Sequence, residues 1–393
     1  MDARRKGKAS ENIKPIRVAV VVPKYGLIGG AENFVFQLTE RLASFEDITI
    51  DVFANKWRKG DALIRFHKIR TIPFPRFLEP LSFALGAYFQ TGKFDLIHSH
   101  DRVFAMDIFT FHGIPHTIWV NDVQHRRFPR LVDFMIAWIE RAGITRNRLK
   151  KILPVSSIAA RALKRCYPSL ETKIDIMPPG IAGDFFQAYD RPREREKIRQ
   201  QYEVLPQETV LLFVGMNFEI KNLDLVLESL AVFFNRGGRN LKLMVVGKGN
   251  EKKYRKKAKT IGIEHLVRFC GPAQAVQPFY LAADLFIMPS FYDTFGMVVL
   301  EAMLAGLPPV ISATVGAKDL VDDTCGFVLP DAACPELVAN IFERLQEVHI
   351  RQALGRNAVK KANDYFWDAL AQRMADNYRS VFLMKQQKRE QMP

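Results

Sequence analysis

Short apolar segments alternate with helix-forming segments along most of the sequence, and this alternation restricts the fold more than any other feature. The run RVAVVV at residues 17–22 is rich in β-branched residues and has no polar face, as expected for a strand buried on both faces of a parallel sheet. Each such run ends in a loop of polar or small residues. Further runs are FDLIHSH (94–100), DIFTFHG (107–113), KKILPVS (150–156), VLLFVG (210–215), LKLMVVG (241–247), HLVRFCG (265–271), DLFIMPS (284–290) and LPPVIS (307–312). The pattern predicts βαβ units and therefore an α/β fold.

The length of 393 residues and the 48% content of hydrophobic residues suit two domains of ordinary size, at about 100–200 residues each. A stretch rich in proline and glycine at 178–183 precedes a dense run of charges and marks a connection between them. We predict two doubly wound domains in tandem, with the strand-ending loops facing one cleft, where such sheets bind ligands. The predicted parts are a basic disordered tail at 1–15, a first domain at 16–185, a second domain at 186–364, and a helix at 365–393 that packs back across both domains.

The chain is basic, because 57 Lys and Arg residues outnumber 42 Asp and Glu residues and give a net charge of +15. This excess favours an anionic partner, which could be a phosphorylated metabolite, a nucleic acid or an acidic lipid surface. The four cysteines have no CxxC spacing, which argues against a zinc site and against a disulfide framework. No apolar run reaches 18 residues and the amino-terminal segment is polar. We therefore expect a cytoplasmic protein whose membrane contact is at most peripheral.

One carboxylate stands in an otherwise apolar segment: Glu301 lies within a helix-length run from residue 295 to 306. Burying an ionised carboxylate is costly unless it is hydrogen-bonded or paired. Asp293 lies eight residues earlier, with Thr294 as an expected helix N-cap and Gly296 as a point of close backbone approach. Two carboxylates and the free N–H groups at a helix start would suit the hydroxyls of a nucleotide-sugar. The pattern leaves open a second interpretation, in which Glu301 pairs with an Arg or caps backbone amides.

The segment PSFYDTFGMVVLEAMLAGLPPVIS (289–312) resembles the signature of the retaining glycosyltransferases of family 4: an acidic residue, seven intervening residues, Glu, then A-x-x-x-G-x-P. These enzymes have the GT-B fold, in which two Rossmann-like doubly wound domains face each other across a cleft. The resemblance implies that Asp293 holds the hydroxyls of the transferred sugar and that Glu301 holds the ribose. The family usually has Glu where this chain has Asp293. The helix start between them, also implied to bind the donor, consists of Thr294, Phe295, Gly296 and Met297.

The segment VGMNFEIKN (214–222) matches the family's glycine-led strand end, where a basic pair neutralises the donor diphosphate. The resemblance assigns Gly215 and Lys221 to this donor site, and Lys221 also to catalysis. Met216 stands where the family commonly has Arg, so Lys221 acts alone or together with Lys248. Without the resemblance, either lysine would be interpreted as an ordinary solvated side chain.

Near the amino terminus, GGAE resembles the family's loop between the first strand and the first helix. It implies that Gly29 and Gly30 let backbone amides approach the donor phosphate or the acceptor, and it places Glu32 at the acceptor. A plain tight turn is the alternative interpretation of the two glycines.

Two strand ends of the first domain carry histidines. DIFTFHG ends in His112, which matches the family's histidine near the sugar's C6 hydroxyl and is assigned to catalysis with Lys221 and Asp293; a structural histidine is the alternative. HSHD supplies His98, His100 and Asp101, and Asp101 is predicted to orient the acceptor. This cluster has no further ligand at a distance, so it is weak evidence for a metal site. We expect no metal and no cofactor.

The resemblance implies transfer with retention, in which the leaving phosphate itself accepts the acceptor's proton and no protein nucleophile or dedicated base is required. Basic and aromatic residues are interleaved at 56–77 and 120–151. They suit a glycolipid or phosphorylated saccharide acceptor, or an anionic membrane surface, but also an ordinary core with a basic outer face. Within the family, the sequence looks most like the bacterial lipopolysaccharide-core glucosyltransferases, which are peripheral membrane enzymes on the inner face of the plasma membrane and use UDP-glucose.

Two other functions remain as alternatives. A nucleotide-sugar epimerase could share the same architecture. A nucleic-acid-binding protein would explain the basic charge, but no helix-turn-helix, zinc-finger or RNA-binding signature accompanies it, and we expect no nucleic-acid partner.

Overall fold

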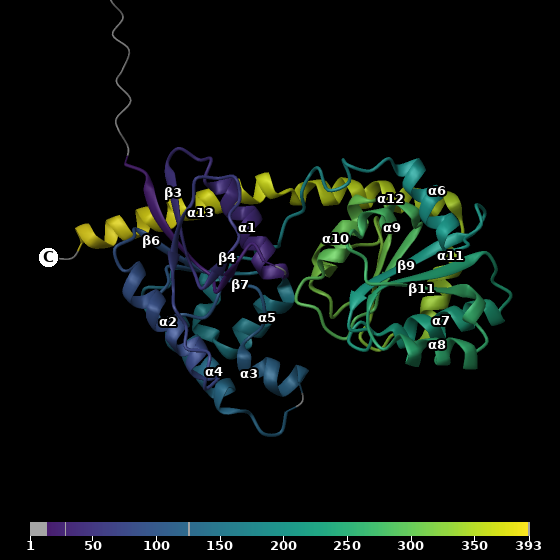
Figure 1. Cartoon of the computed structure of the whole chain (residues 1–393), viewed down its shortest axis with the longest axis horizontal. Helices are drawn as coiled ribbons and strands as arrows, with labels where there is room; N and C mark the ends of the chain where they lie inside the picture. The colour runs from purple at the N-terminus through teal and green to yellow at the C-terminus, as the bar shows by residue number, and fades with distance from the viewer. Residues whose placement is uncertain (1–13, 28, 125, 392–393) are drawn as a thin grey trace, which may run out of the picture. The chain divides into compact units, whose positions relative to one another are not determined.

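The computed structural model describes residues 14–27, 29–124 and 126–391, and within them the chain forms two six-stranded parallel sheets (Figure 1). The predicted disordered tail falls outside the described residues except for its last two positions. The strands of the first sheet are β1 (Ile16–Val21), β3 (Ile48–Ala54), β5 (Arg65–Lys68), β6 (Leu96–Ser99), β7 (Ile108–Phe111) and β8 (Lys151–Pro154). Those of the second are β9 (Thr209–Met216), β10 (Leu241–Lys248), β11 (Val267–Gly271), β12 (Leu285–Met288), β13 (Pro309–Ser312) and β14 (Phe327–Leu329).

Both sheets are doubly wound, as predicted. The strand order is β5-β3-β1-β6-β7-β8 in the first sheet and β11-β10-β9-β12-β13-β14 in the second. In each sheet the chain starts near the middle, builds outward to one side, and then crosses back to build the other side. The order therefore reverses between β1 and β6 and between β9 and β12, and such reversal points are where open α/β sheets bind ligands.

Helices connect the strands. They are α1 (Gly30–Leu42), α2 (Leu78–Thr91), α3 (His116–Ile118), α4 (Leu131–Ile144), α5 (Ser157–Cys166), α6 (Arg191–Gln201), α7 (Leu223–Asn235), α8 (Glu251–Thr260), α9 (Gln277–Ala282), α10 (Met297–Leu304), α11 (Pro335–Arg344), α12 (Val348–Ala362) and α13 (Trp367–Glu390). A two-stranded parallel ribbon, β2 (Lys24–Tyr25) with β4 (Lys56–Trp57), lies outside the two sheets.

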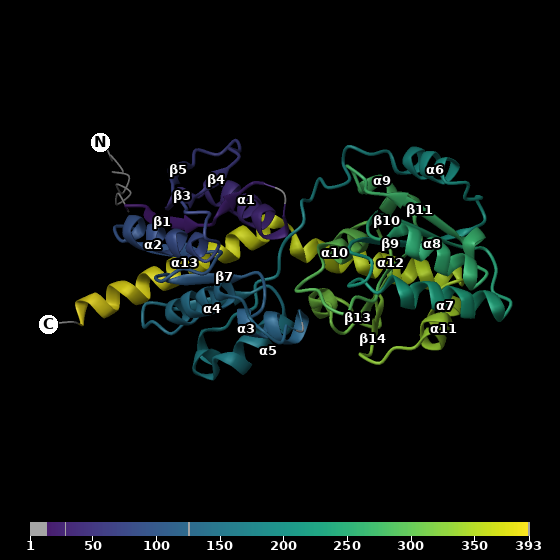
Figure 2. The same ribbon diagram turned by 60° about the horizontal axis from the view of Figure 1, so that its bottom comes forward.

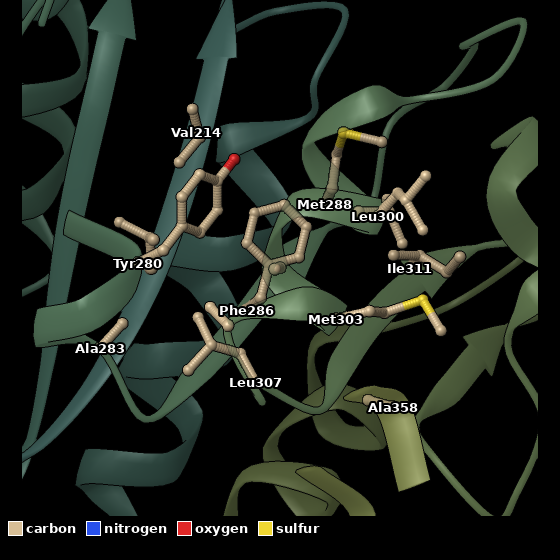
Figure 3. Packing of buried hydrophobic residues seen from close by; sticks show 14 of the residues in the cluster. Val214, Tyr280, Ala283, Phe286, Met288, Leu300, Met303, Leu307, Ile311 and Ala358 are labelled. Carbon is tan, nitrogen blue, oxygen red and sulfur yellow. The ribbon is translucent and has the colours of Figure 1, made fainter. Parts of the chain in front are cut away.

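The second sheet is covered on both faces, which explains the long apolar runs in its strands. Successive residues of a strand point to opposite faces. Leu212 and Val214 of β9 pack in a cluster with α9, α10 and α12, whereas Leu211 and Phe213 pack in a cluster with α7, α8 and α11. Figures 1 and 2 show these two groups of helices on opposite sides of the strands, and Figure 3 shows the first cluster.

The chain divides into two compact units that do not follow chain order. The first unit contains residues up to 110, residues 129–152 and the chain from 371 onward, and the second contains residues 111–128 and 153–370. The four predicted domain ranges stay a prediction, since compactness alone does not define parts that fold independently.

The last helix, α13, covers Trp367–Glu390, and most of it lies in the first unit; its packing across both predicted domains stays a prediction. The Tyr378 hydroxyl lies 2.7 Å from Nδ1 of the buried His98, and Nζ of Lys151 donates to the Asn377 side chain at 2.6 Å. Arg379 forms a bidentate ion pair with Asp47. Among the described residues, no helix has the length and hydropathy needed to span a membrane.

Candidate donor and acceptor sites

The second unit brings two of the predicted site residues together at the point where its strand order reverses. Lys221 follows β9, Asp293 follows β12, and the Lys221 ammonium forms an ion pair with Oδ2 of Asp293. The two side chains are 15% and 22% exposed, so the pair is largely but not fully shielded from solvent. Oδ1 of Asp293 accepts a hydrogen bond from the backbone N–H of Phe295 at 3.1 Å. The pair therefore lies where an α/β sheet of this order binds a ligand.

The ends of β9 and β10 approach so closely that a glycine is required at position 247. A Cβ on Gly247, which has a φ of +132°, would lie 1.9 Å from the carbonyl oxygen of Gly215. A Cβ on Gly215 would lie 3.0 Å from Cγ of Lys221, so Gly215 forms the surface on which that lysine rests. Met216 and Lys248 follow these glycines, pair with each other in the parallel register of β9 and β10, and are exposed. Lys248 forms no ion pair with a described residue and is available to an anion at this edge.

The loop before α10 is built differently from the prediction. Thr294 is not the N-cap: Gly296 takes that position, with a φ of +89°, and the helix begins at Met297. Oγ1 of Thr294 instead lies 3.1 Å from the hydroxyl of Tyr292, and its carbonyl oxygen accepts a hydrogen bond from the Ser156 hydroxyl. The prediction was wrong because Gly296, in the left-handed conformation, precedes the first helical residue, so Thr294 lies two residues before the N-cap.

Helix α10 is shorter than predicted and not buried all round. It covers eight residues, and four of them form one partly exposed stripe, namely Met297, Val298, Glu301 and Leu304. The other four positions are buried against the sheet. The carboxylate thus lies on the partly exposed face of the helix, flanked by apolar side chains.

Glu301 has one hydrogen-bond partner among the described residues. Its Oε2 accepts a hydrogen bond from the hydroxyl of Tyr280 at 2.8 Å. Tyr280 belongs to α9, and its ring lies beside that of Phe286 in the buried cluster (Figure 3). No Arg or Lys of the described chain pairs with Glu301, and no described backbone N–H caps it. Burial raises the pKa of Glu301, and the hydrogen bond from Tyr280 opposes that shift. The pKa of Tyr280 lies well above its usual value because of burial and this carboxylate, so the phenol stays a donor.

The predicted acceptor residues lie in the first unit, at the reversal point of its sheet. Glu32 folds back over the start of α1, where a Cβ on Gly29 would meet its carboxylate at 2.0 Å, while no atom lies within 4 Å of such a Cβ on Gly30. Asp101 follows β6, and its Oδ1 accepts a hydrogen bond from the backbone N–H of Arg102 at 2.6 Å. Burial raises the pKa of Asp101, and Glu32 adds to this shift against the opposing charge of Arg102. Glu32 and Asp101 are therefore close enough to interact electrostatically.

The histidines have different surroundings. Both ring nitrogens of His98 face hydroxyls, Nδ1 that of Tyr378 and Nε2 that of Thr110 at 2.8 Å, so this residue joins α13 to β7. Its ring lies 4.1 Å from that of His100, measured between centroids. His112 follows β7 directly, and burial lowers its pKa to about 3, so its imidazole is neutral at physiological pH. Among the described residues, no three His, Cys, Asp or Glu side chains are grouped to hold a metal ion.

Two tyrosines of the site were not predicted. Tyr280 lies 21 residues before the carboxylate that it contacts, and only the packing of α9 against α10 brings them together. Tyr292 is adjacent to Asp293, and burial together with that charge raises its pKa to about 12 although Thr294 hydrogen-bonds to it. Its ring faces that of Trp119 at 6.0 Å. The only signal in the sequence for these two residues was the position of Tyr292 next to the predicted site residue Asp293.

Two family models match the chain. The model described as "Glycosyltransferase Family 4" matches residues 28–184, and the model described as "Glycosyl transferases group 1" matches residues 194–361. Together they include Gly29 to Asp101 of the first unit and Lys221 to Glu301 of the second.

Known proteins agree with these matches. The lipopolysaccharide glucosyltransferase WaaG of Escherichia coli K12 is 29% identical over 242 residues, which are 61% of this chain and 65% of WaaG. A D-inositol 3-phosphate glycosyltransferase of Acidothermus cellulolyticus is 25% identical over 93% of this chain and 91% of its own length. The crystal structure of WaaG superposes with a TM-score of 0.74 at 22% identity, covering 92% of this chain and 99% of that one. Anabaena HepE in complex with UDP and glucose superposes with a TM-score of 0.69 at 18% identity, covering 93% and 100%.

Proposed function

Because the chain belongs to the GT-B glycosyltransferases that these two models describe, we propose that it transfers a hexose, with retention of configuration, from UDP-glucose to a glycolipid such as the lipopolysaccharide core. The observation that carries the proposal is Glu301: a carboxylate on the partly exposed stripe of α10 with one oxygen bound to Tyr280 and no described partner for the other. A ribose diol would complete its hydrogen bonds. The names of WaaG and of the HepE complex support the choice of UDP-glucose.

In the proposed reaction the protein stabilises charge and positions the substrates. Lys221 holds the diphosphate, Lys248 adds a second positive charge where Met216 replaces the family's Arg, and Asp293 turns from Lys221 toward the hydroxyls of the sugar. The backbone N–H groups of Thr294, Gly296 and Met297 face the donor, since that of Phe295 donates to Asp293. The neutral His112 forms a hydrogen bond with a sugar hydroxyl near the reacting carbon. The leaving phosphate accepts the proton of the acceptor hydroxyl. No metal and no cofactor enters these steps.

The test is a panel of labelled nucleotide-sugars, each incubated with the protein with and without a lipid A–core extract. We expect UDP-glucose to be consumed only when the extract is present, with the label recovered in the glycolipid. Release of an epimer or of free sugar without an acceptor would favour an epimerase, and a panel in which no nucleotide-sugar is consumed would overturn the proposal.

We also propose that the enzyme works on the cytoplasmic face of the membrane and touches it through α4. Three apolar side chains spaced three and four residues apart on this helix, Leu131, Phe134 and Trp138, are 61%, 61% and 54% exposed. We name these three residues the aromatic ridge. Two basic residues of the same unit flank the aromatic ridge, and this combination of aromatic and basic residues is typical of surfaces that bind anionic lipid. The flanking residues are Arg130 and Arg141.

Substitution of Phe134 by Ser should reduce binding to vesicles of phosphatidylcholine and phosphatidylglycerol by about tenfold or more, because each aromatic residue transferred into lipid contributes about 1.5–3 kcal/mol. Sedimentation with the vesicles measures the bound fraction. Leu63→Ser is the matched control, since Leu63 is a fully exposed apolar residue of the same unit outside the aromatic ridge. Equal binding by Phe134→Ser and wild type would remove this contact from the proposal.

A further inference from the structure

The first unit contains a cavity of about 830 Å³ at the carboxyl ends of its strands. Pro23 follows β1, Asn55 follows β3 and Asp101 follows β6, and all three line the cavity. It therefore opens where the order of the sheet reverses, and its volume falls within the range of about 300–1,000 Å³ that small-molecule sites occupy.

The walls of this cavity differ in character. One side is apolar and comes from α2 and α4, through Phe83, Ile136 and Ile139. The other lining residues include the cations Lys24, Lys56, Arg76 and Arg102 and the carboxylates Glu79 and Asp101. Arg102 is bound to the buried Glu140 at 2.7 Å. Lys24, Lys56 and Arg76 are exposed and form no ion pair with any residue in the described parts of the chain.

Two of these cations repel each other in the free protein. Lys24 and Lys56 are direct partners in the parallel pairing of β2 with β4, so their side chains project from the same face of the ribbon about 5 Å apart at the backbone. Like charges directly opposite each other destabilise a pair of strands. An anion placed between the two lysines would turn this repulsion into attraction, and Arg76 approaches the same cavity from the segment before α2.

We infer that this cavity binds the acceptor through a phosphate ester, held by Lys24, Lys56 and Arg76, while the carboxylate of Asp101 accepts hydrogen bonds from hydroxyls of the acceptor sugar. The inference rests on the proposed function and narrows it to phosphorylated saccharides. The apolar wall from Phe83 and Ile136 packs against the carbon face of the sugar ring.

The test compares two acceptors that carry no lipid, so that membrane binding plays no part. They are core oligosaccharide released by mild acid, and the same oligosaccharide after enzymatic removal of its phosphates. Wild-type protein should show a KM about tenfold lower for the phosphorylated form, which is the effect expected of one charge-assisted contact. In the double variant Lys24→Gln/Lys56→Gln the ratio of the two KM values should fall toward one.

A second readout separates this role from a structural one. Without any acceptor, the double variant should melt about 1–2 °C higher than wild type, because the repulsion between the two lysines is gone. Lys93→Gln is the control, since it removes an exposed charge of the same unit that does not line the cavity. It should keep both the melting temperature and the KM ratio of wild type.

Two failures can be told apart. If the donor is consumed but wild type and the double variant have the same ratio of KM values for the two oligosaccharides, the proposed phosphate site is wrong. The proposed glycosyl transfer is not contradicted by that result. If no nucleotide-sugar is consumed with any acceptor, the proposed function fails, and the assignment of this cavity to an acceptor fails with it.

Discussion

Glu301→Gln should weaken binding of the nucleotide-sugar by about 10- to 100-fold and at the same time make the protein more stable near neutral pH. The loss of affinity follows because a carboxylate accepts two hydroxyl hydrogen bonds of a ribose, whereas an amide has one accepting oxygen, and a hydrogen bond to a charged group contributes about 1.5–3 kcal/mol. Titration calorimetry with UDP-glucose measures the affinity. Glu301→Ala should abolish transfer while the chain stays folded, and unchanged turnover in either variant would contradict the assignment of Glu301 to the donor.

The gain in stability follows from the pKa of Glu301, which burial raises above its ordinary value of 4.5. The folded protein then binds the proton more tightly than the unfolded chain, so wild type loses stability as the pH rises from about 4.5 through the folded pKa. Gln does not titrate, and the advantage of the variant should therefore be small at pH 4 and larger at pH 7, as measured by urea unfolding.

Asp322→Asn is the control with the opposite sign. Hydrogen bonds from Lys361 and Thr324 lower the pKa of Asp322 to about 2, so its charge stabilises the fold above the ordinary value of 3.8. This variant should be less stable than wild type at pH 7, and the difference should shrink as the pH falls toward 2. A Glu301→Gln variant that is less stable than wild type at pH 7 would show that the charged carboxylate is needed by the fold and not by a ligand.

Lys221→Met should lower kcat by about 10²- to 10³-fold, which is the usual loss when one group that stabilises developing charge is removed. In the proposed reaction the leaving diphosphate gains negative charge in the transition state, and Lys221 lies at the reversal point of the second sheet. Steady-state kinetics with saturating acceptor measures the effect. Lys221→Arg keeps the charge and should retain more activity than Lys221→Met.

Lys248→Met is the matched comparison, because Lys248 lies at the end of the neighbouring strand without an ion pair to a described residue. We expect a smaller loss of kcat than in Lys221→Met and a clear rise in the KM for the donor. Equal kcat in Lys221→Met and wild type would contradict the placement of the diphosphate at this edge.

Most of the strands that the sequence predicted are buried on both faces and have long apolar runs, whereas the edge strand β11 was predicted although it contains Arg268. β3 was missed, since its sequence ITIDVFA carries an acid in the middle. The structure shows why the acid is tolerated: Asp51 is buried, forms an ion pair with Arg65 at 3.2 Å, and is hydrogen-bonded to Nε2 of His67 at 2.7 Å. Both partners come from β5, an edge strand with the polar sequence RFHK, which no apolar pattern could reveal. The polar side chains of the two strands bond to each other, so neither strand can be recognised from its own sequence alone.

The candidate site also contains some features that were predictable from the sequence and others that were not. Lys221 and Asp293 were predictable because residues that follow neighbouring parallel strands meet at one edge of the sheet. The contact between Tyr280 and Glu301 was not predictable, since it depends on how two helices of six and eight residues pack. The N-cap at Gly296 was missed because left-handed backbone at glycine leaves no pattern that distinguishes it from an ordinary turn.

The attachment of α13 sets the order in which this protein can be completed during synthesis. Buried His98 depends on the phenol of Tyr378, and Asp107 receives Lys385 at 2.9 Å, so the amino-terminal sheet finds these partners more than 270 residues later in the chain. Helix α13 is synthesised after the strands of both sheets, so a nascent chain that has reached only residue 364 lacks the partners that α13 supplies to His98 and Asp107.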